Sequence, residues 1–173
     1  MPYRFLLLAL STAALAACST PAPQPAQAIA KLQATSGSKV SGDVKFTQKD
    51  GQQVMISAVI YGLKPNSEHG FHIHDKGDCG DNGNAAAGHF NPMGNPHGQY
   101  DTTQHHMGDL PSLKADSNGV ATVNVQSRDL TLLAGPGNVI DRAVIVHAQP
   151  DDYTTQPTGN AGARIACAVI TRD

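Results

Sequence analysis

The chain has 173 residues, of which 15% are charged and 5% aromatic, with 17 Gly, 11 Pro, eight His and no Trp. A formal net charge of −2 without any basic run argues against nucleic-acid binding. This length suits one domain, and aliphatic residues between many Gly- and Pro-containing turns favour an all-β sandwich or barrel over a helical bundle.

Residues 1–17 are typical of an export signal. Arg4 precedes the apolar run 5–17, which is too short to span a membrane and ends in the tripeptide LAA before Cys18. This ending resembles the bacterial lipobox, so we expect cleavage before Cys18 and lipidation of its thiol. The alternative is plain secretion that leaves Cys18 as a free thiol. Ser19 after the cysteine favours sorting to the outer membrane.

Residues 18–30 are rich in Pro, Ala and Gln and predict a flexible tether, so the folded domain is expected to span 31–173. The expected protein lies on the periplasmic side of a bacterial cell envelope and contacts a membrane only through its N-terminal lipid. With Cys18 lipidated, Cys79 and Cys167 form an even pair in an exported chain. This predicts one disulfide closing a long loop, with two buried free thiols as the alternative.

Alternating apolar residues predict roughly eight short strands and no helix. The clearest strands are expected over 39–48, 54–60, 70–74, 121–125, 143–147 and 165–171. A hairpin turn is expected at 50–51. Two long stretches without periodicity, 77–111 and 151–162, interrupt the strands, and loops of this length inside a compact domain are usually functional.

Histidines gather in and beside these two loops. His72 and His74 lie two apart on a predicted strand, so their side chains leave one face about 7 Å apart. Alone this spacing is a weak signal, but further donors follow in the first loop and on a later strand: His89, His97, His106, Asp109 and His147. Zinc favours four-coordinate sites of His and Asp, and imidazole-rich sites suit copper(II). The residue types are therefore compatible with two neighbouring sites for different metals.

Five ordered motifs resemble the copper/zinc superoxide dismutase family: 70–74 (GFHIH), 87–92 (AGHFNP), 106–110 (HMGDL), 144–147 (VIVH) and 159–167 (GNAGARIAC). The resemblance covers roughly 31–173. It implies the family's flattened eight-stranded Greek-key β-barrel, itself an example of the immunoglobulin-like sandwich architecture, with two long functional loops. It also implies disproportionation of superoxide to oxygen and hydrogen peroxide, at a redox-active copper bridged to a structural zinc.

The resemblance assigns roles position by position. The implied copper ligands are His72, His74, His89 and His147. The implied zinc ligands are His89, His97, His106 and Asp109. His89 then bridges the two ions and, in the family mechanism, supplies a proton to the forming peroxide. Asp151 matches the carboxylate that hydrogen-bonds one histidine of each site, and Arg164 matches the arginine that docks the anion beside copper.

Other positions also match the family. Cys79 and Cys167 match its disulfide, and the early position of Cys79 resembles the bacterial exported branch. Lys76, just past the copper strand, is expected to steer the anionic substrate, with a solvated loop lysine as the alternative. His69 matches a non-ligand position behind the copper site, where we expect it to support the backbone. His105, next to a zinc ligand, is expected to be exposed.

The alternative function is a non-catalytic copper- or zinc-binding module with the same fold. Such relatives usually lack a copper ligand or the arginine, whereas this chain has every one of them. Members of the bacterial branch are monomers or homodimers, and no interface stripe is readable in the sequence. An exported enzyme cannot reach cytosolic superoxide, so its expected substrate is superoxide from outside the cell.

Overall fold

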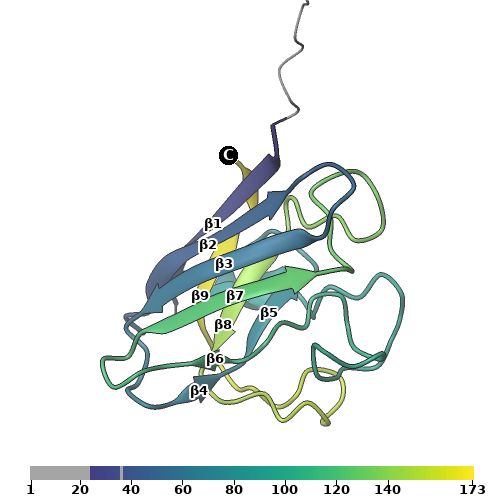
Figure 1. Cartoon of the computed structure of the whole chain (residues 1–173). Helices are drawn as coiled ribbons and strands as arrows, with labels where there is room; N and C mark the ends of the chain where they lie inside the picture. The colour runs from purple at the N-terminus through teal and green to yellow at the C-terminus, as the bar shows by residue number, and fades with distance from the viewer. Residues whose placement is uncertain (1–23, 36) are drawn as a thin grey trace, which may run out of the picture.

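The computed structural model describes residues 24–35 and 37–173, and most of the strands in these ranges form one antiparallel sheet that curls into two facing layers (Figure 1). The strands are β1 (Ala26–Ala34), β2 (Ser41–Gln48), β3 (Val54–Tyr61), β4 (Glu68–His69), β5 (Phe71–His74), β6 (Leu113–Lys114), β7 (Ala121–Ser127), β8 (Ala143–His147), β9 (Arg164–Val169) and β10 (Thr171–Arg172). Their order across the sheet is β5-β8-β9-β1-β2-β3-β7, with β10 paired to β1 and a separate β4–β6 pair. The predicted all-β Greek-key fold is confirmed.

The core lies between the two layers. Strands β2 and β3 alternate buried and exposed residues, with Phe46 and Ile56 fully buried, as expected when one face of a sheet meets the core and the other meets water. Strand β8 is buried throughout, because Ala143 and Ile145 on its outer face are covered by Ala86 from the first long loop. The site-bearing strand is therefore covered on both sides.

The expected tether is too long at its C-terminal end. Residues 26–32 of β1 pair with β2, and Ala28 and Ala30 are buried in the core. Strand β1 therefore begins at Ala26, and the expected start of the domain at Lys31 is wrong. Every second residue of 26–30 faces the core and is an alanine, so the segment forms a strand although its composition is typical of a linker. The signal segment 1–17, Cys18 and the first part of the tether lie outside the described residues.

The first long loop contains a short 3₁₀ helix, η1 (Asp81–Ala86), where no helix was expected. A disulfide joins Cys79, just before η1, to Cys167 on β9, at a sequence separation of 88, which confirms the predicted pairing. The loop is thereby attached covalently to the layer that carries β5 and β8. No helix among residues 24–35 and 37–173 has the length and apolar character needed to cross a membrane.

Candidate metal centre

Two strands and the first long loop bring the candidate metal-ligating side chains together. His72 and His74 come from β5, and His147 ends the neighbouring antiparallel strand β8. The loop folds back onto β5 through two isolated antiparallel bridges, His72↔Asp109 and His74↔His89. Backbone pairing therefore places the loop ligands beside the strand ligands.

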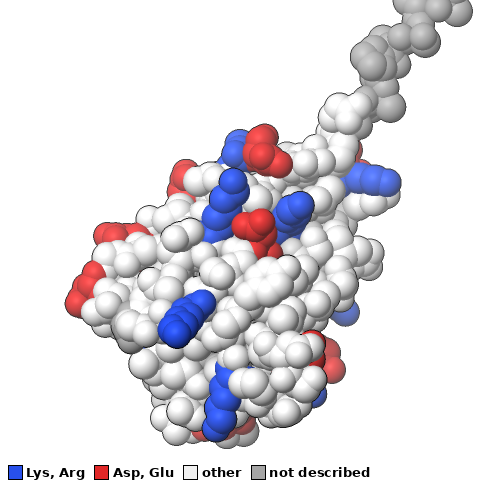
Figure 2. Space-filling model, turned by 90° about the vertical axis from the view of Figure 1, so that its left-hand side faces the viewer, with Lys and Arg blue, Asp and Glu red and all other residues white. Residues whose placement is uncertain are grey.

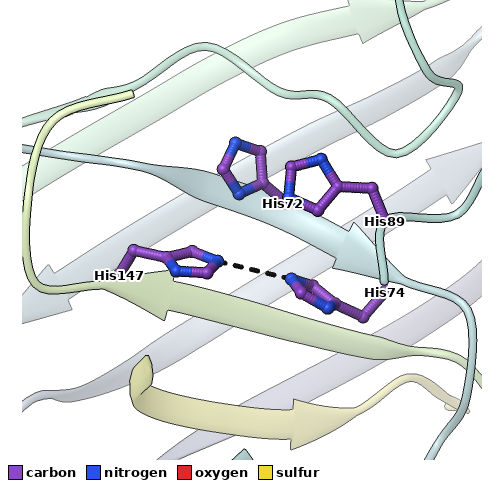
Figure 3. A group of neighbouring side chains, drawn as sticks. All are labelled: His72, His74, His89 and His147. Atoms are coloured by element: carbon purple, nitrogen blue, oxygen red, sulfur yellow. Dashed lines mark hydrogen bonds between the residues drawn. The ribbon is translucent and has the colours of Figure 1, made fainter. Parts of the chain in front are cut away.

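The first cluster consists of four buried imidazoles, His72, His74, His89 and His147 (Figure 3). One nitrogen from each ring lies within 4.8 Å of the corresponding nitrogens of the other three. The rings of His72 and His89 stack with centroids 3.9 Å apart, and those of His74 and His147 lie 5.5 Å apart. The structure brings together all four residues that the sequence suggested for copper.

Hydrogen bonds fix which nitrogen of each ring carries a proton. A carbonyl oxygen only accepts, so His74 donates from Nδ1 to Ala87 O (2.8 Å) and His147 donates from Nδ1 to Gly162 O (3.2 Å). In a neutral ring the lone pair is then on Nε2, and these two Nε2 atoms face each other 3.3 Å apart (Figure 3). Two lone pairs at this distance fit a cation that both can bind.

The other two rings of the cluster also direct an unprotonated nitrogen inward. His72 donates from Nε2 to Asp151 Oδ2 (2.7 Å), which leaves the lone pair on Nδ1. His72 Nδ1 and His89 Nε2 are buried and have no hydrogen-bond partner among the described residues. A buried polar atom without a partner is costly, and ligation of a metal ion would satisfy both atoms.

Burial keeps the rings of His74, His89 and His147 neutral, which is the form that binds metals. Burial, with the nearby rings of His72 and His97, lowers the pKa of His89 to about 4, although the Asp109 hydrogen bond opposes this. Burial also lowers the pKa of His147 to about 3, with a further contribution from His72. The pKa of His74 lies well below its ordinary value, again mainly because of burial.

The second cluster combines three imidazoles with one carboxylate: His89, His97, His106 and Asp109, all buried. Asp109 Oδ1 lies 2.8 Å from His89 Nδ1, 3.1 Å from His97 Nδ1 and 3.4 Å from His106 Nδ1. His89 belongs to both clusters, with Nε2 directed to the first and Nδ1 to the second. Three nitrogens and one oxygen match the four-coordinate sets that zinc prefers.

The carboxylate of Asp109 stays ionised although it is buried. Burial raises its pKa, but hydrogen bonds from His106, His89 and His97 outweigh this and hold the pKa far below its ordinary value. The opposite effect acts on His97, where burial lowers the pKa but hydrogen bonds to Asp109 and Asp151 raise it to about 9. Asp109 Oδ2 also accepts the backbone N–H groups of His106 (2.8 Å) and Gly98 (3.2 Å), which fix its orientation.

Asp151 links the two clusters from outside. Its Oδ2 accepts from His72 Nε2 (2.7 Å), and its Oδ1 accepts from His97 Nε2 (2.9 Å) and from the backbone N–H of Tyr153 (2.8 Å). Gly159 passes directly over this contact with φ +67°, and a Cβ there would lie 1.8 Å from Asp151 Oδ1. Only glycine fits at this position.

Arg164, at the start of β9, reaches the rim of the first cluster. Its guanidinium is half-buried and donates to Gly83 O (2.5 Å) and Ala87 O (2.6 Å). Burial lowers its pKa, but a guanidinium stays charged at any relevant pH. Ala87 O therefore accepts from both Arg164 and His74 Nδ1. Sequence reasoning missed this link, because a backbone acceptor leaves no signature in the residue type.

The remaining histidines lie outside the two clusters. His69 is buried and donates from Nδ1 to His147 O (2.8 Å), which confirms its expected support of the backbone. The expectation that His105 is exposed is wrong. His105 points away from the clusters, donating from Nδ1 to His106 O (2.6 Å), but it is buried against Tyr100, with ring centroids 5.9 Å apart. Lys76 is exposed.

An antiparallel β-sandwich whose two histidine-rich clusters share one imidazole defines a protein with a paired metal centre. The family model described as copper/zinc superoxide dismutase (SODC) matches residues 40–170. A "Superoxide dismutase [Cu-Zn]" of Paramecium bursaria Chlorella virus 1 is 43% identical over 153 residues, covering 85% of this chain and 79% of the relative. The solved structure of the clock protein EA4 is 36% identical, with a TM-score of 0.76, covering 88% of this chain and 98% of that one.

The chain belongs to the copper/zinc superoxide dismutase family. Its activity is the disproportionation of superoxide, and copper and zinc are its cofactors.

The contacts of Asp151 lead to a test of its role in metal binding. We expect Asp151→Asn to lower zinc affinity by about 10–100-fold, because outer partners of ligating histidines fix the tautomer and ring orientation. Competition with a chromophoric chelator measures this affinity. The matched control is Asp152→Asn, since the neighbouring carboxylate is exposed and accepts its hydrogen bonds from Thr154 and Thr155 rather than from a histidine of either cluster. Equal zinc affinities in the two variants would contradict the assigned role.

Proposed function

We propose that the first cluster holds the copper ion and the second the zinc ion of this dismutase. The proposed copper ligands are His72, His74, His89 and His147, and the proposed zinc ligands are His89, His97, His106 and Asp109. The observation that carries the proposal is the inward direction of the lone pairs in the first cluster, above all the two Nε2 atoms 3.3 Å apart. An all-imidazole set suits copper(II), whereas the set with a carboxylate suits zinc.

When bound, copper supplies the one-electron redox chemistry, and zinc, which has no redox chemistry, orders the loop ligands. The chain contributes geometry, charge and protons. His89 is the residue suited to proton delivery, because its Nε2 faces the first cluster and has no hydrogen-bond partner in the described part of the chain. We infer that this nitrogen, when it is not ligating, takes up a proton and donates it to the reduced oxygen species as a general acid.

Arg164 is proposed to dock the superoxide anion. Its guanidinium has five N–H donors, and the carbonyls of Gly83 and Ala87 hold it at the rim of the cluster while leaving further donors for the substrate. The shared acceptor Ala87 O also fixes the arginine relative to His74. The anion would thus meet a positive charge at a set position beside the ligand rings.

Replacement of Arg164 tests both the site and the reaction. We expect Arg164→Ala to retain one copper and one zinc per chain and to lower kcat/KM by at least about tenfold, with Arg164→Lys in between. Pulse radiolysis measures the rate and elemental analysis the metals. Unchanged turnover would remove Arg164 from the site. A wild-type domain that holds both metals without activity would favour the metal-binding module instead.

Lys76 is proposed to steer superoxide toward the site. On the face drawn in Figure 2, basic side chains lie among acidic ones, and the chain is net negative, so attraction for an anion has to arise locally. Lys76 is exposed two residues after His74. A local charge of this kind raises the rate of encounter without taking part in the chemistry.

Salt dependence tests this proposal. We expect Lys76→Gln to lower kcat/KM by about two- to fivefold at low ionic strength and to match the wild type near 1 M salt, where charges are screened within about 3 Å. The control is Lys45→Gln, because Lys45 is exposed on the outer face of β2 in the other layer. An equal loss in both variants, or a loss that persists at high salt, would argue against steering.

We propose that the protein is exported, lipidated at Cys18 and held on the periplasmic side of the outer membrane, as a monomer or a homodimer. The apolar run 5–17 and the LAA tripeptide before Cys18 support this. Because β1 begins at Ala26, only a short segment would separate the lipid from the fold. The domain would then remove superoxide that reaches the cell envelope from outside.

Lipidation can be tested in the full-length chain expressed in a bacterium with two membranes. We expect wild-type protein in the outer-membrane fraction with a labelled fatty acid attached, and Cys18→Ser in neither state. Cys79→Ser is the matched control, because that thiol belongs to the disulfide and its loss leaves the lipid in place. Soluble, unlabelled wild-type protein would contradict the proposal.

A further inference from the structure

Arg142 lies outside both clusters, immediately before β8. Its side chain makes four contacts. Its Nε–H donates to Asn138 O (2.9 Å), and its Nη1 donates to both Asp75 O (2.5 Å) and Asp75 Oδ1 (2.7 Å). Its Cζ stands 3.7 Å above the centre of the Phe90 ring, which is a cation–π contact. The backbone of Arg142 is also fixed, since its carbonyl accepts from Ile170 N–H (2.8 Å).

The two residues that this side chain joins are the sequence neighbours of two ligating histidines. Asp75 follows His74, and Phe90 follows His89. His74 and His89 face each other in an isolated bridge, so only a short ladder links β5 to the loop here. That ladder includes Asp75 N–H to Gly88 O (2.9 Å) and Phe90 N–H to Ile73 O (2.8 Å). Arg142, from a third segment of the chain, contacts both sides of this ladder through Asp75 and Phe90.

We propose that Arg142 is a positioning residue that sets the distance and tilt between the His74 and His89 rings. These rings lie 5.0 Å apart at 68°. The inference rests on the proposed function, in which both rings bind the same copper ion. The guanidinium suits this task because it is planar: its face lies over Phe90 while Nη1 at its edge donates to Asp75.

The exposure of the Arg142–Asp75 pair allows a positioning role to be distinguished from a contribution to folding stability. Asp75 is exposed and the Arg142 side chain is only partly buried, and ion pairs of this kind contribute little to folding. Variants at these two positions are therefore expected to fold and to bind both metals. A displacement of the ligand rings, by contrast, is sensed directly by the copper ion and by the approaching substrate, since misplacement by 1 Å costs up to about a hundredfold in rate.

The test uses the fully metal-loaded protein in three variants. Arg142→Lys keeps the charge but loses the planar fork and the stacking, Arg142→Gln loses the charge as well, and Asp75→Asn weakens one contact. We expect full metal content, altered copper(II) electron paramagnetic resonance parameters in all three, and kcat/KM lower by about three- to tenfold in both Arg142 variants at every ionic strength. The control is Arg172→Gln, whose guanidinium likewise donates to a backbone carbonyl, Leu132 O (2.9 Å), and whose copper(II) spectrum and rate should match the wild type.

Three outcomes would overturn the inference. A copper(II) spectrum unchanged in the Arg142 variants would show that the rings keep their geometry without this contact. A loss of rate confined to Arg142→Gln and abolished by salt would assign Arg142 to charge steering instead. A wild-type protein without a copper(II) signal from histidine nitrogens would remove the copper assignment itself, whereas a normal wild-type signal with unchanged variants removes only the positioning role.

Discussion

The placement of single protons on the imidazole rings governs the metal centre. A neutral imidazole has one N–H and one lone pair, so an acceptor that takes the N–H turns the lone pair to the opposite side of the ring. The carbonyls of Ala87 and Gly162 do this for two rings, and the Asp151 carboxylate does it for a third. The groups around the histidines therefore decide where a cation can bind, although none of them needs to contact it.

The same constraint explains why the loops have to be held firmly. The three groups that orient these rings, Ala87, Asp151 and Gly162, all lie on loops, where the backbone has no continuous ladder to fix it. The Cys79–Cys167 disulfide attaches one loop to β9, and Arg164 bonds to two carbonyls of that loop. The sheet is rigid, and the disulfide and the Arg164 hydrogen bonds hold the loop carbonyls in fixed positions relative to it.

The sequence predicted the site better than it predicted its surroundings. Residue type and spacing identify His72 and His74 as a pair on one strand, and the resemblance to a known family supplied the remaining members of both clusters. The strand β1 was missed because its core-facing positions are alanines such as Ala28, whose small side chains do not mark a strand by hydropathy. The burial of His105 was missed because it depends on a loop that folds Tyr100 over it, and local sequence carries no such information.

Charge distinguishes the two clusters in a way that bears on metal binding. In the first cluster burial lowers the pKa of His89 to about 4 and that of His147 to about 3, so at neutral pH these rings contribute no positive charge. In the second, His97 has a pKa of about 9, so at neutral pH its ring is a cation. Its Nδ1–H then faces Asp109 and its Nε2–H faces Asp151.

A metal that binds His97 Nδ1 must displace that proton, and metal affinity there depends on pH for this reason. A metal in the first cluster displaces none and instead brings positive charge to nitrogens that already lack hydrogens. The shared ring of His89 joins these two environments, so the charge gained on one of its nitrogens changes the basicity of the other. In the proposed assignment, a single imidazole would therefore couple a redox ion to a structural one without any movement of the fold.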